Sequence, residues 1–229
     1  MKVGTDGVLL GAWVEPLPAP LLKRGRILDV GTGSGLIARM LMQRCPQAEV
    51  EGIDIDAAAV EQARENGIKA FCSRLQDWGV RSQDSGFRSQ DSDISVQPYD
   101  LIVSNPPYFQ NSLKNPDKGR QTARHTDTLS YDELLAHSAR LLSEHGQLAL
   151  ILPAEAEDEV RELAARYLLY CSRATRVYSK ASKPARRVLL LFEMSRSRDL
   201  EMTTDSLILE NETGGRSAAY SELCKEFYL

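Results

Sequence analysis

The sequence predicts an α/β fold with a mostly parallel, seven-stranded sheet whose last strand runs antiparallel. Short apolar runs rich in branched side chains alternate with segments of helical spacing along most of the chain. A glycine-rich turn follows the first of these runs, and Asn105-Pro106-Pro107-Tyr108 follows another. Strands that alternate with helices form a parallel sheet covered on both faces. The last two apolar runs are separated by only a short loop, which predicts an antiparallel hairpin at one edge.

The elements follow in chain order from propensity and capping signals. Thr5 or Asp6 can cap a short N-terminal helix, and Ser130 with Glu133 forms a capping box before another helix. The expected strands are residues 26–30, 49–53, 69–73, 99–104, 147–152, 174–178 and 187–192, and the expected helices are residues 36–44, 57–66, 131–143, 155–167 and a terminal helix from about residue 217.

Overall composition restricts the class of protein. The chain has 229 residues, which favours one domain with an appendage over two domains. The net charge is −4, so any nucleic-acid surface must be local. The four cysteines are scattered without a CxxC pair, which leaves a zinc site unsupported and indicates reduced, cytosolic thiols in a chain that shows no signal peptide. No apolar run approaches the length of a membrane span.

A polar segment at about residues 81–97 interrupts the alternation of strands and helices. Arg-Ser-Gln-Asp-Ser occurs at positions 81–85 and again at positions 88–92, with few apolar residues to bury. We therefore expect a flexible surface insertion between the third and fourth strands. We divide the chain into a domain at residues 1–195, which contains this insertion, and a C-terminal appendage at residues 196–229 that packs on the same domain.

The glycine-rich turn from Gly31 to Gly35 predicts a cofactor cradle. Glycines let the backbone approach a ligand, and the N-terminus of the following helix offers free N–H groups. Asp54 ends the next strand, at the spacing from which a carboxylate reaches ribose hydroxyls; its alternative role is a helix N-cap. Asp29 precedes the glycines and can orient the amino end of a methionine moiety, which favours S-adenosylmethionine over a dinucleotide. The alternative for Asp29 is an acid that stabilises the loop.

The Asn-Pro-Pro-Tyr corner is suited to holding a planar group that carries an NH2. Two prolines fix φ twice, and the residue before a proline is pushed out of the α region. The side-chain oxygen of Asn105 and the carbonyl of Pro106 can each accept one N–H and aim the nitrogen lone pair at a methyl donor, while Tyr108 stacks on the ring. An ordinary strand-ending turn is the alternative. If the first and fourth strands flank the switch point of the sheet, this corner faces the cradle.

Together, Asp29–Gly35, Asp54 and Asn105–Tyr108 resemble the class I S-adenosylmethionine-dependent methyltransferases that act on exocyclic or amide nitrogens. The resemblance implies their Rossmann-like fold, with seven strands and an antiparallel last strand. It also implies S-adenosyl-L-methionine as the cofactor. The catalytic candidates are Asn105, Pro106, Pro107 and Tyr108. The cofactor-binding candidates are Asp29, Gly31, Thr32, Gly33, Gly35, Asp54, Ile55, Asp77, Thr5 and Asp6.

A narrower resemblance rests on Lys2–Trp13, Asn105–Phe109, Arg187–Leu190 and Phe227–Leu229, which look like the YfiC-type tRNA1(Val) (adenine-N6)-methyltransferases. It covers nearly the whole chain outside the insertion. It implies N6-methylation of the adenine beside the anticodon of a valine tRNA, in the cytoplasm, with tRNA as the partner and with neither a membrane nor a metal ion involved. The oligomeric state cannot be read from the sequence, and a monomer is favoured.

The chain departs from the family pattern in two places. Family members usually carry a further segment before the Lys-Val-Gly-Thr-Asp stretch, so we expect either a start upstream of Met1 or the loss of part of the cofactor lid and RNA surface. The acid that commonly follows the third strand, where it contacts the cofactor adenine, is replaced by Arg74. Asp77, three residues later, can take its place through a shift in the turn.

Two basic loops predict a local phosphate footprint. No acidic residue occurs between Glu162 and Glu193, and a second basic cluster follows the Asn-Pro-Pro-Tyr corner. A solvated surface that balances acidic helices is the alternative. The RNA-binding candidates are Lys114, Lys118, Arg120, Arg124, Lys180, Lys183, Arg186 and Arg187.

Three further functions remain open. A protein glutamine-amide methyltransferase would use the same corner, since a carboxamide also carries a planar NH2. An rRNA base amine, such as guanine N2, is another substrate that fits. The third is a binding module that keeps the fold without activity, against which the intact Asn105–Tyr108 corner argues.

Overall fold

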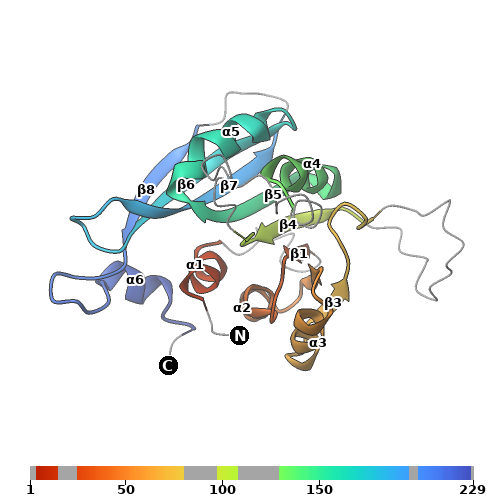
Figure 1. The fold of residues 1–229 in the computed structure, drawn as a ribbon, viewed down its shortest axis with the longest axis horizontal. Coiled ribbons are helices and arrows are strands. Elements are labelled where there is room, and N and C mark those ends of the chain that lie inside the picture. The colour runs from red at the N-terminus through yellow and green to blue at the C-terminus, as the bar shows by residue number, and fades with distance from the viewer. Residues whose placement is uncertain (1–3, 15–24, 80–96, 108–128, 196–200, 228–229) are drawn as a thin grey trace, which may run out of the picture.

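The computed structural model describes residues 4–14, 25–79, 97–107, 129–195 and 201–227 (Figure 1). The strands are β1 (Arg26–Val30), β2 (Glu49–Asp54), β3 (Lys69–Cys72), β4 (Tyr99–Ser104), β5 (Leu142–Pro153), β6 (Leu169–Tyr178), β7 (Ala185–Met194) and β8 (Thr203–Ile208). The helices are α1 (Thr5–Trp13), α2 (Leu36–Arg44), α3 (Ala57–Glu65), α4 (Tyr131–Leu141), α5 (Glu157–Ala165) and α6 (Ala218–Leu223), with a 3-10 turn, η3 (Ala154–Ala156), before α5.

The strands form one eight-stranded sheet in the order β3-β2-β1-β4-β5-β7-β6-β8. Strand β7 pairs antiparallel with both β5 and β6, while the other pairings are parallel. The first seven strands confirm the predicted sheet and its antiparallel last strand. The predicted hairpin of β6 and β7 is not the sheet edge, because β8 adds to β6. Four of the six residues of β8 are exposed and polar, so the sequence carried no strand pattern there.

Both faces of the sheet are covered by helices, as a parallel sheet requires. Helices α1, α2, α3 and α6 lie on one face and α4 and α5 on the other (Figure 1). Successive residues of the central strands therefore enter different cores. In β4, Leu101 and Val103 belong to the first core, whereas Ile102 belongs to the second. This explains why the strands read as continuous apolar runs.

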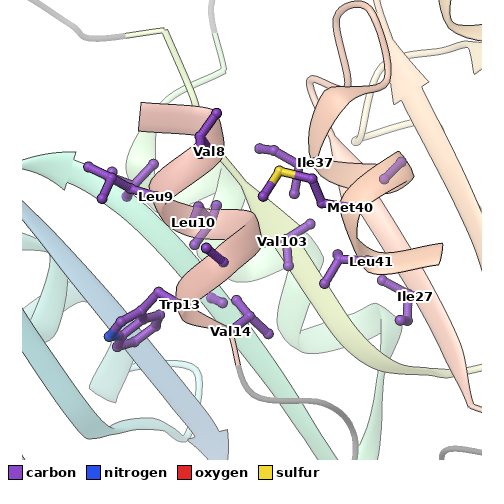
Figure 2. Packing of buried hydrophobic residues seen from close by; sticks show 14 of the residues in the cluster. Val8, Leu9, Leu10, Trp13, Val14, Ile27, Ile37, Met40, Leu41 and Val103 are labelled. Atoms are coloured by element: carbon purple, nitrogen blue, oxygen red, sulfur yellow. The ribbon is translucent and has the colours of Figure 1, made fainter. Parts of the chain in front are cut away.

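Helix α1 packs beside α2 (Figure 2), and two glycines of α1 face that helix and allow the close approach. A Cβ at Gly7 would lie 3.2 Å from Leu36 Cδ2, and one at Gly11 would lie 2.8 Å from Met40 Sδ. Residue Gly4 is the N-cap of α1, so the prediction that Thr5 or Asp6 caps this helix is wrong. Both residues instead lie in its first turn.

The C-terminal segment contacts the same sheet and the same core. Strand β8 pairs with β6, and Tyr220 and Cys224 are buried in the core that α1 and α2 share. The Gln43 side chain of α2 also donates a hydrogen bond to the carbonyl of Glu226 at 3.2 Å. These contacts support the proposal that the C-terminal appendage and residues 1–195 form one domain.

None of the described helices is long and apolar enough to cross a membrane. Within the same residues, no group of three or more His, Cys, Asp or Glu side chains is arranged to hold a metal ion. The four cysteines are free thiols, and Cys72 is the exposed one.

Candidate active site

The glycine turn and the Asn-Pro-Pro corner are neighbours at the carboxyl edge of the sheet. The strand order places β1 between β2 and β4, so the switch point lies between β1 and β4 as predicted. Val30 and Ser104, the last residues of these strands, are register partners. The buried hydroxyl of Ser104 donates to the carbonyl of Val30 at 2.8 Å. This bond fixes the start of the Asn105 corner against the start of the glycine turn.

The glycine turn adopts a backbone that only glycine accommodates without strain. Gly31, Gly33 and Gly35 have φ values of +71°, +56° and +82°. The N–H groups of Gly31 and Thr32 donate to the carbonyl of Ile53 at 2.9 and 3.0 Å, which ties the turn to the end of β2. A Cβ at Gly31 would meet no atom within 4 Å. The backbone at Gly31 therefore borders open space in which a ligand can approach it.

The Asp29 carboxyl lies beneath this turn and is fully buried. Its Oδ2 accepts hydrogen bonds from the Thr32 hydroxyl at 2.7 Å and from the Ala38 N–H at 3.1 Å. Asp29 does not line the pocket described below. These contacts are those of the loop-stabilising acid that the sequence left as the alternative. The second oxygen, Oδ1, is buried without a hydrogen-bond partner among the described residues.

Burial gives Asp29 a measurable effect on the pH dependence of stability. Desolvation raises the pKa of the Asp29 carboxyl from 3.8 to about 6, although the bonds from Thr32 and Ala38 favour its charged form. Between these two pH values the folded protein holds more protons at this site than the unfolded chain, so this contribution to stability decreases as pH rises.

We therefore expect the Asp29→Asn variant, which cannot titrate, to gain stability relative to the parent as pH rises from about 4 to about 7. Urea unfolding at several pH values measures the difference. If the free energies of unfolding of the two proteins changed with pH in parallel, the burial argument would be contradicted.

Asp54 contacts the glycine turn at the end of β2. Its Oδ2 accepts the Gly33 N–H at 2.9 Å, and its Oδ1 accepts the Asp56 N–H at 3.0 Å. The N-cap of α3 is Asp56, whose carboxylate accepts the Ala58 N–H at 2.9 Å. The alternative of Asp54 as a helix cap is therefore wrong. Asp54 lines the pocket beside Ile55, a residue that is 59% exposed.

A pocket of about 1000 Å³ connects the glycine turn to the Asn-Pro-Pro corner. Gly35, Thr5 and Asp6 were predicted to bind the cofactor but do not line it; Gly35 faces Ile68 and Ala63 between α2 and α3. Tyr108 lies outside the described residues. The predicted site residues that do line the pocket are Gly31, Thr32, Gly33, Asp54, Ile55, Asp77, Asn105, Pro106 and Pro107.

Two walls of the pocket were missed by the sequence analysis. Gly4, the N-cap of α1, and Gly7 of α1 form one, and Leu129 with Glu133 at the start of α4 forms the other. Glu133 also accepts a hydrogen bond from the Gln76 side chain at 3.3 Å, which joins α4 to the turn after β3. The only sequence signal at Glu133 was the capping box, which the structure confirms. That signal predicts a helix start and carries no information about a ligand.

The turn after β3 brings both Arg74, which replaces the family's acid, and Asp77, the predicted adenine contact, into the pocket. Arg74 and Asp77 each line it, and the Asp77 N–H donates to the carbonyl of Arg74 at 3.2 Å. Trp78 anchors the turn because its indole N–H donates to the Tyr99 hydroxyl at 3.0 Å in the core. Arg140 of α4 donates to the carbonyl of Trp78 at 3.0 Å. The substitution of Asp77 for the missing acid is thus compatible with the geometry.

The described basic candidates lie near this edge of the sheet but have different partners. Strand β6 runs in the same direction as β5, so the hairpin loop at residues 179–184 lies at the carboxyl edge. Lys180 contacts Glu210 at 3.5 Å, and Arg187 contacts Asp6 at 2.9 Å. Lys183 and Arg186 are exposed. Lys114, Lys118, Arg120 and Arg124 lie outside the described residues.

The pocket fits S-adenosylmethionine. Gly31 leaves an open approach to the backbone, Asp54 has carboxylate oxygens that could accept hydrogen bonds from ribose hydroxyls, and the exposed Ile55 could pack on a purine. Asn105 and Pro106 line the same pocket, after β4 on the other side of β1 from Asp54. A cofactor held along the glycine turn and a planar amine held at Asn105 would therefore share one cavity.

Comparison with known proteins agrees with the geometry. Residues 11–167 match the family described as Methyltransferase small domain. The chain is 42% identical over 231 residues to a tRNA1(Val) (adenine(37)-N6)-methyltransferase of Bacteroides fragilis, covering 100% of this chain and 91% of that protein. It is 44% identical to a protein of the same description from Porphyromonas gingivalis, covering 100% and 89%. A structure from Agrobacterium tumefaciens described as a predicted O-methyltransferase shares the fold, with a TM-score of 0.68 at 17% identity and 96% coverage of both chains.

The fold and the pocket define a class I methyltransferase, and S-adenosyl-L-methionine is its cofactor. The long matches to curated relatives narrow the class, because identity extends over the whole chain rather than over the cofactor motifs alone. The chain belongs to the family of the tRNA1(Val) (adenine(37)-N6)-methyltransferases. The resemblance seen in the sequence is thereby confirmed.

Proposed function

We propose that this protein transfers a methyl group from S-adenosyl-L-methionine to N6 of adenine 37 in tRNA1(Val), the reaction that its relatives are named for. One observation carries the proposal: Asn105 and Pro106 line the same pocket as the glycine turn and Asp54. We also propose that the protein acts in the cytoplasm, as a monomer, on tRNA. Methyl transfer from a sulfonium requires neither a metal ion nor a covalent nucleophile.

The proposed chemistry depends on the Asn105 corner. S-adenosylmethionine supplies a methyl group on a sulfonium, and the C–S bond breaks as the N–C bond forms, leaving a neutral thioether. The Asn105 side-chain oxygen and the Pro106 carbonyl accept the two N–H bonds of the adenine amine. This pairing draws the nitrogen lone pair out of conjugation with the ring and holds it in line for attack. The methylated amine then loses one proton to water.

The bond from Ser104 to Val30 supports this role, because it keeps Asn105 at a constant distance from the glycine turn. Pro106 is buried and Pro107 is exposed, so the corner is fixed on one side and open to the pocket on the other. A preorganised acceptor of this kind needs no rearrangement during the reaction.

The function is tested by incubating the protein with labelled cofactor and tRNA1(Val), followed by digestion to nucleosides. We expect label in N6-methyladenosine, and its loss when adenine 37 is replaced by guanine. A release-factor protein and rRNA serve as competing substrates. Label in a glutamine side chain would instead indicate a protein glutamine-amide methyltransferase, and label in N2-methylguanosine would indicate an rRNA base-amine methyltransferase. No label with any substrate would favour a binding module.

We further propose that Lys183 and Arg186 contact tRNA phosphates, since both are exposed at the edge of the sheet where the pocket opens. Replacing both with alanine should weaken tRNA binding and make the slope of log K against log salt concentration less steep by about 2. The matched control is Lys180→Ala, because the Lys180 ammonium already contacts Glu210 at 3.5 Å. An unchanged slope in the double variant would remove these residues from the RNA surface.

A further inference from the structure

Arg187 and Asp6 form an ion pair across almost the full length of the chain. The Arg187 Nε donates to Asp6 Oδ2 at 2.9 Å, between residues 181 positions apart. The two side chains are 30% and 24% exposed, so the pair is more than half buried. Arg187 stands near the start of β7, opposite Pro153 at the end of β5, and Asp6 stands in the first turn of α1. The pair therefore joins the carboxyl edge of the sheet to the N-terminal end of α1.

The N-terminal end of α1 is the end that borders the cofactor pocket. Gly4 and Gly7 line the pocket, and the N-cap Gly4 offers no side-chain hydrogen bond to the helix. The C-terminal half of α1 has separate anchors: Arg44 donates to the carbonyl of Ala12 at 3.0 Å, and the Trp13 indole donates to the Thr175 hydroxyl at 2.8 Å. These anchors hold the helix axis, whereas Asp6 holds the turn that faces the ligand.

Sequence reasoning gave these two residues separate roles, with Asp6 as a cofactor ligand and Arg187 as an RNA ligand. In the structure, Asp6 does not line the pocket, and Arg187 forms an ion pair with Asp6. Arg187 also donates from Nη1 to the carbonyl of Arg186 at 2.9 Å. The guanidinium thus spans the first turn of α1 and the backbone of β7 next to the hairpin loop.

We propose that Asp6 and Arg187 are a positioning pair, which fixes the first turn of α1 as a wall of the cofactor pocket. This inference rests on the proposed function only in placing S-adenosylmethionine in that pocket. Neither side chain contacts the reacting atoms. The pair acts through Gly4 and Gly7, whose distance from the glycine turn depends on how α1 is held.

The test measures binding of S-adenosylhomocysteine by calorimetry and the KM and kcat of the methylation reaction. Arg187→Ala and Asp6→Ala should each raise the Kd and the KM for the cofactor about 5–20-fold, with kcat at saturating cofactor within about twofold of the parent. The double alanine variant should show no more loss than either single variant, because both remove the same interaction. The charge-swapped variant, Asp6→Arg with Arg187→Asp, should recover part of the affinity.

Two control variants separate this role from other effects. Arg186→Ala should change the salt dependence of tRNA binding and leave the cofactor Kd at the parent value. Lys225→Ala removes an exposed ion pair with Glu222 on α6 and should alter neither. Unfolding temperatures identify any variant that loses affinity through misfolding, and in that case the charge-swapped variant should restore both folding and binding.

Three outcomes would overturn the inference. They are a parental cofactor Kd in Arg187→Ala, additive losses in the double alanine variant, and a change of tRNA salt slope in Arg187→Ala equal to that in Arg186→Ala. Failure of the parent itself to bind S-adenosylhomocysteine would instead count against the proposed function. Binding without methylation of tRNA would leave the positioning pair standing and reject the substrate.

Discussion

Asn105→Ala is expected to lower kcat by about 10²–10³-fold, the usual loss when one preorganised hydrogen-bonding group that stabilises a transition state is removed. The exocyclic amine of adenine is a poor nucleophile because its lone pair is delocalised into the ring. The Asn105 oxygen works against that delocalisation only as the nitrogen becomes pyramidal, so the loss should fall on kcat rather than on binding. Asn105 follows β4, on the other side of β1 from the strand that ends at Asp54, so the substitution leaves the proposed cofactor contacts intact.

The measurement pairs single-turnover methylation of tRNA with calorimetric binding of S-adenosylhomocysteine, whose Kd should stay within about twofold of the parent. Asn105→Asp is the matched variant, because a carboxylate keeps the acceptor oxygen and loses the amide donor. It should retain more activity than Asn105→Ala if the corner works as an acceptor. Equal activity of Asn105→Ala and the parent would refute the proposed chemistry, and an inactive Asn105→Asp would point to the amide NH2 instead.

The parts of the fold that the sequence predicted are those governed by short-range patterns. Apolar runs marked the first seven strands, and positive-φ glycines marked the turn after β1. The meeting of Gly31 and Asn105 was also predictable, because a parallel sheet brings the carboxyl ends of β1 and β4 together whatever the loops do.

Contacts between distant segments were not predictable in the same way. The exposed side chains of β8 carry no alternation, so its pairing with β6 depends on free backbone groups at a sheet edge. Glu133 reaches the pocket because the register of β4 and β5 places α4 beside the turn after β3. Arg187 had the charge of an RNA ligand, and only the tertiary structure supplies its partner Asp6. A residue type restricts what a side chain can bind, and the fold decides which partner is within reach.

Gly31 and Gly35 illustrate the same limit, because the sequence assigned both to the cofactor. Both have positive φ, but a Cβ at Gly35 would lie 2.6 Å from Ile68 Cγ1 and 3.3 Å from Ala63 Cβ, whereas a Cβ at Gly31 would meet nothing within 4 Å. Gly35→Ala adds overpacking to backbone strain, and we expect it to lower the free energy of unfolding by about 2–4 kcal/mol. Gly31→Ala carries the backbone strain alone and should cost about 1 kcal/mol.

Gly31→Ala should weaken cofactor binding more than Gly35→Ala does, which is the reverse of their order in stability. Gly31 lines the pocket and Gly35 does not, so a methyl group at position 31 occupies space that the cofactor would use. Urea unfolding and calorimetric binding of S-adenosylhomocysteine measure the two effects separately. The Gly35→Ala, Ile68→Ala double variant supplies the control, since it removes the atom that the new methyl group would strike. It should be destabilised by less than the sum of the two single variants. Additive losses would mean that backbone strain, rather than contact between α2 and the Ile68 side chain, accounts for the need for glycine at position 35.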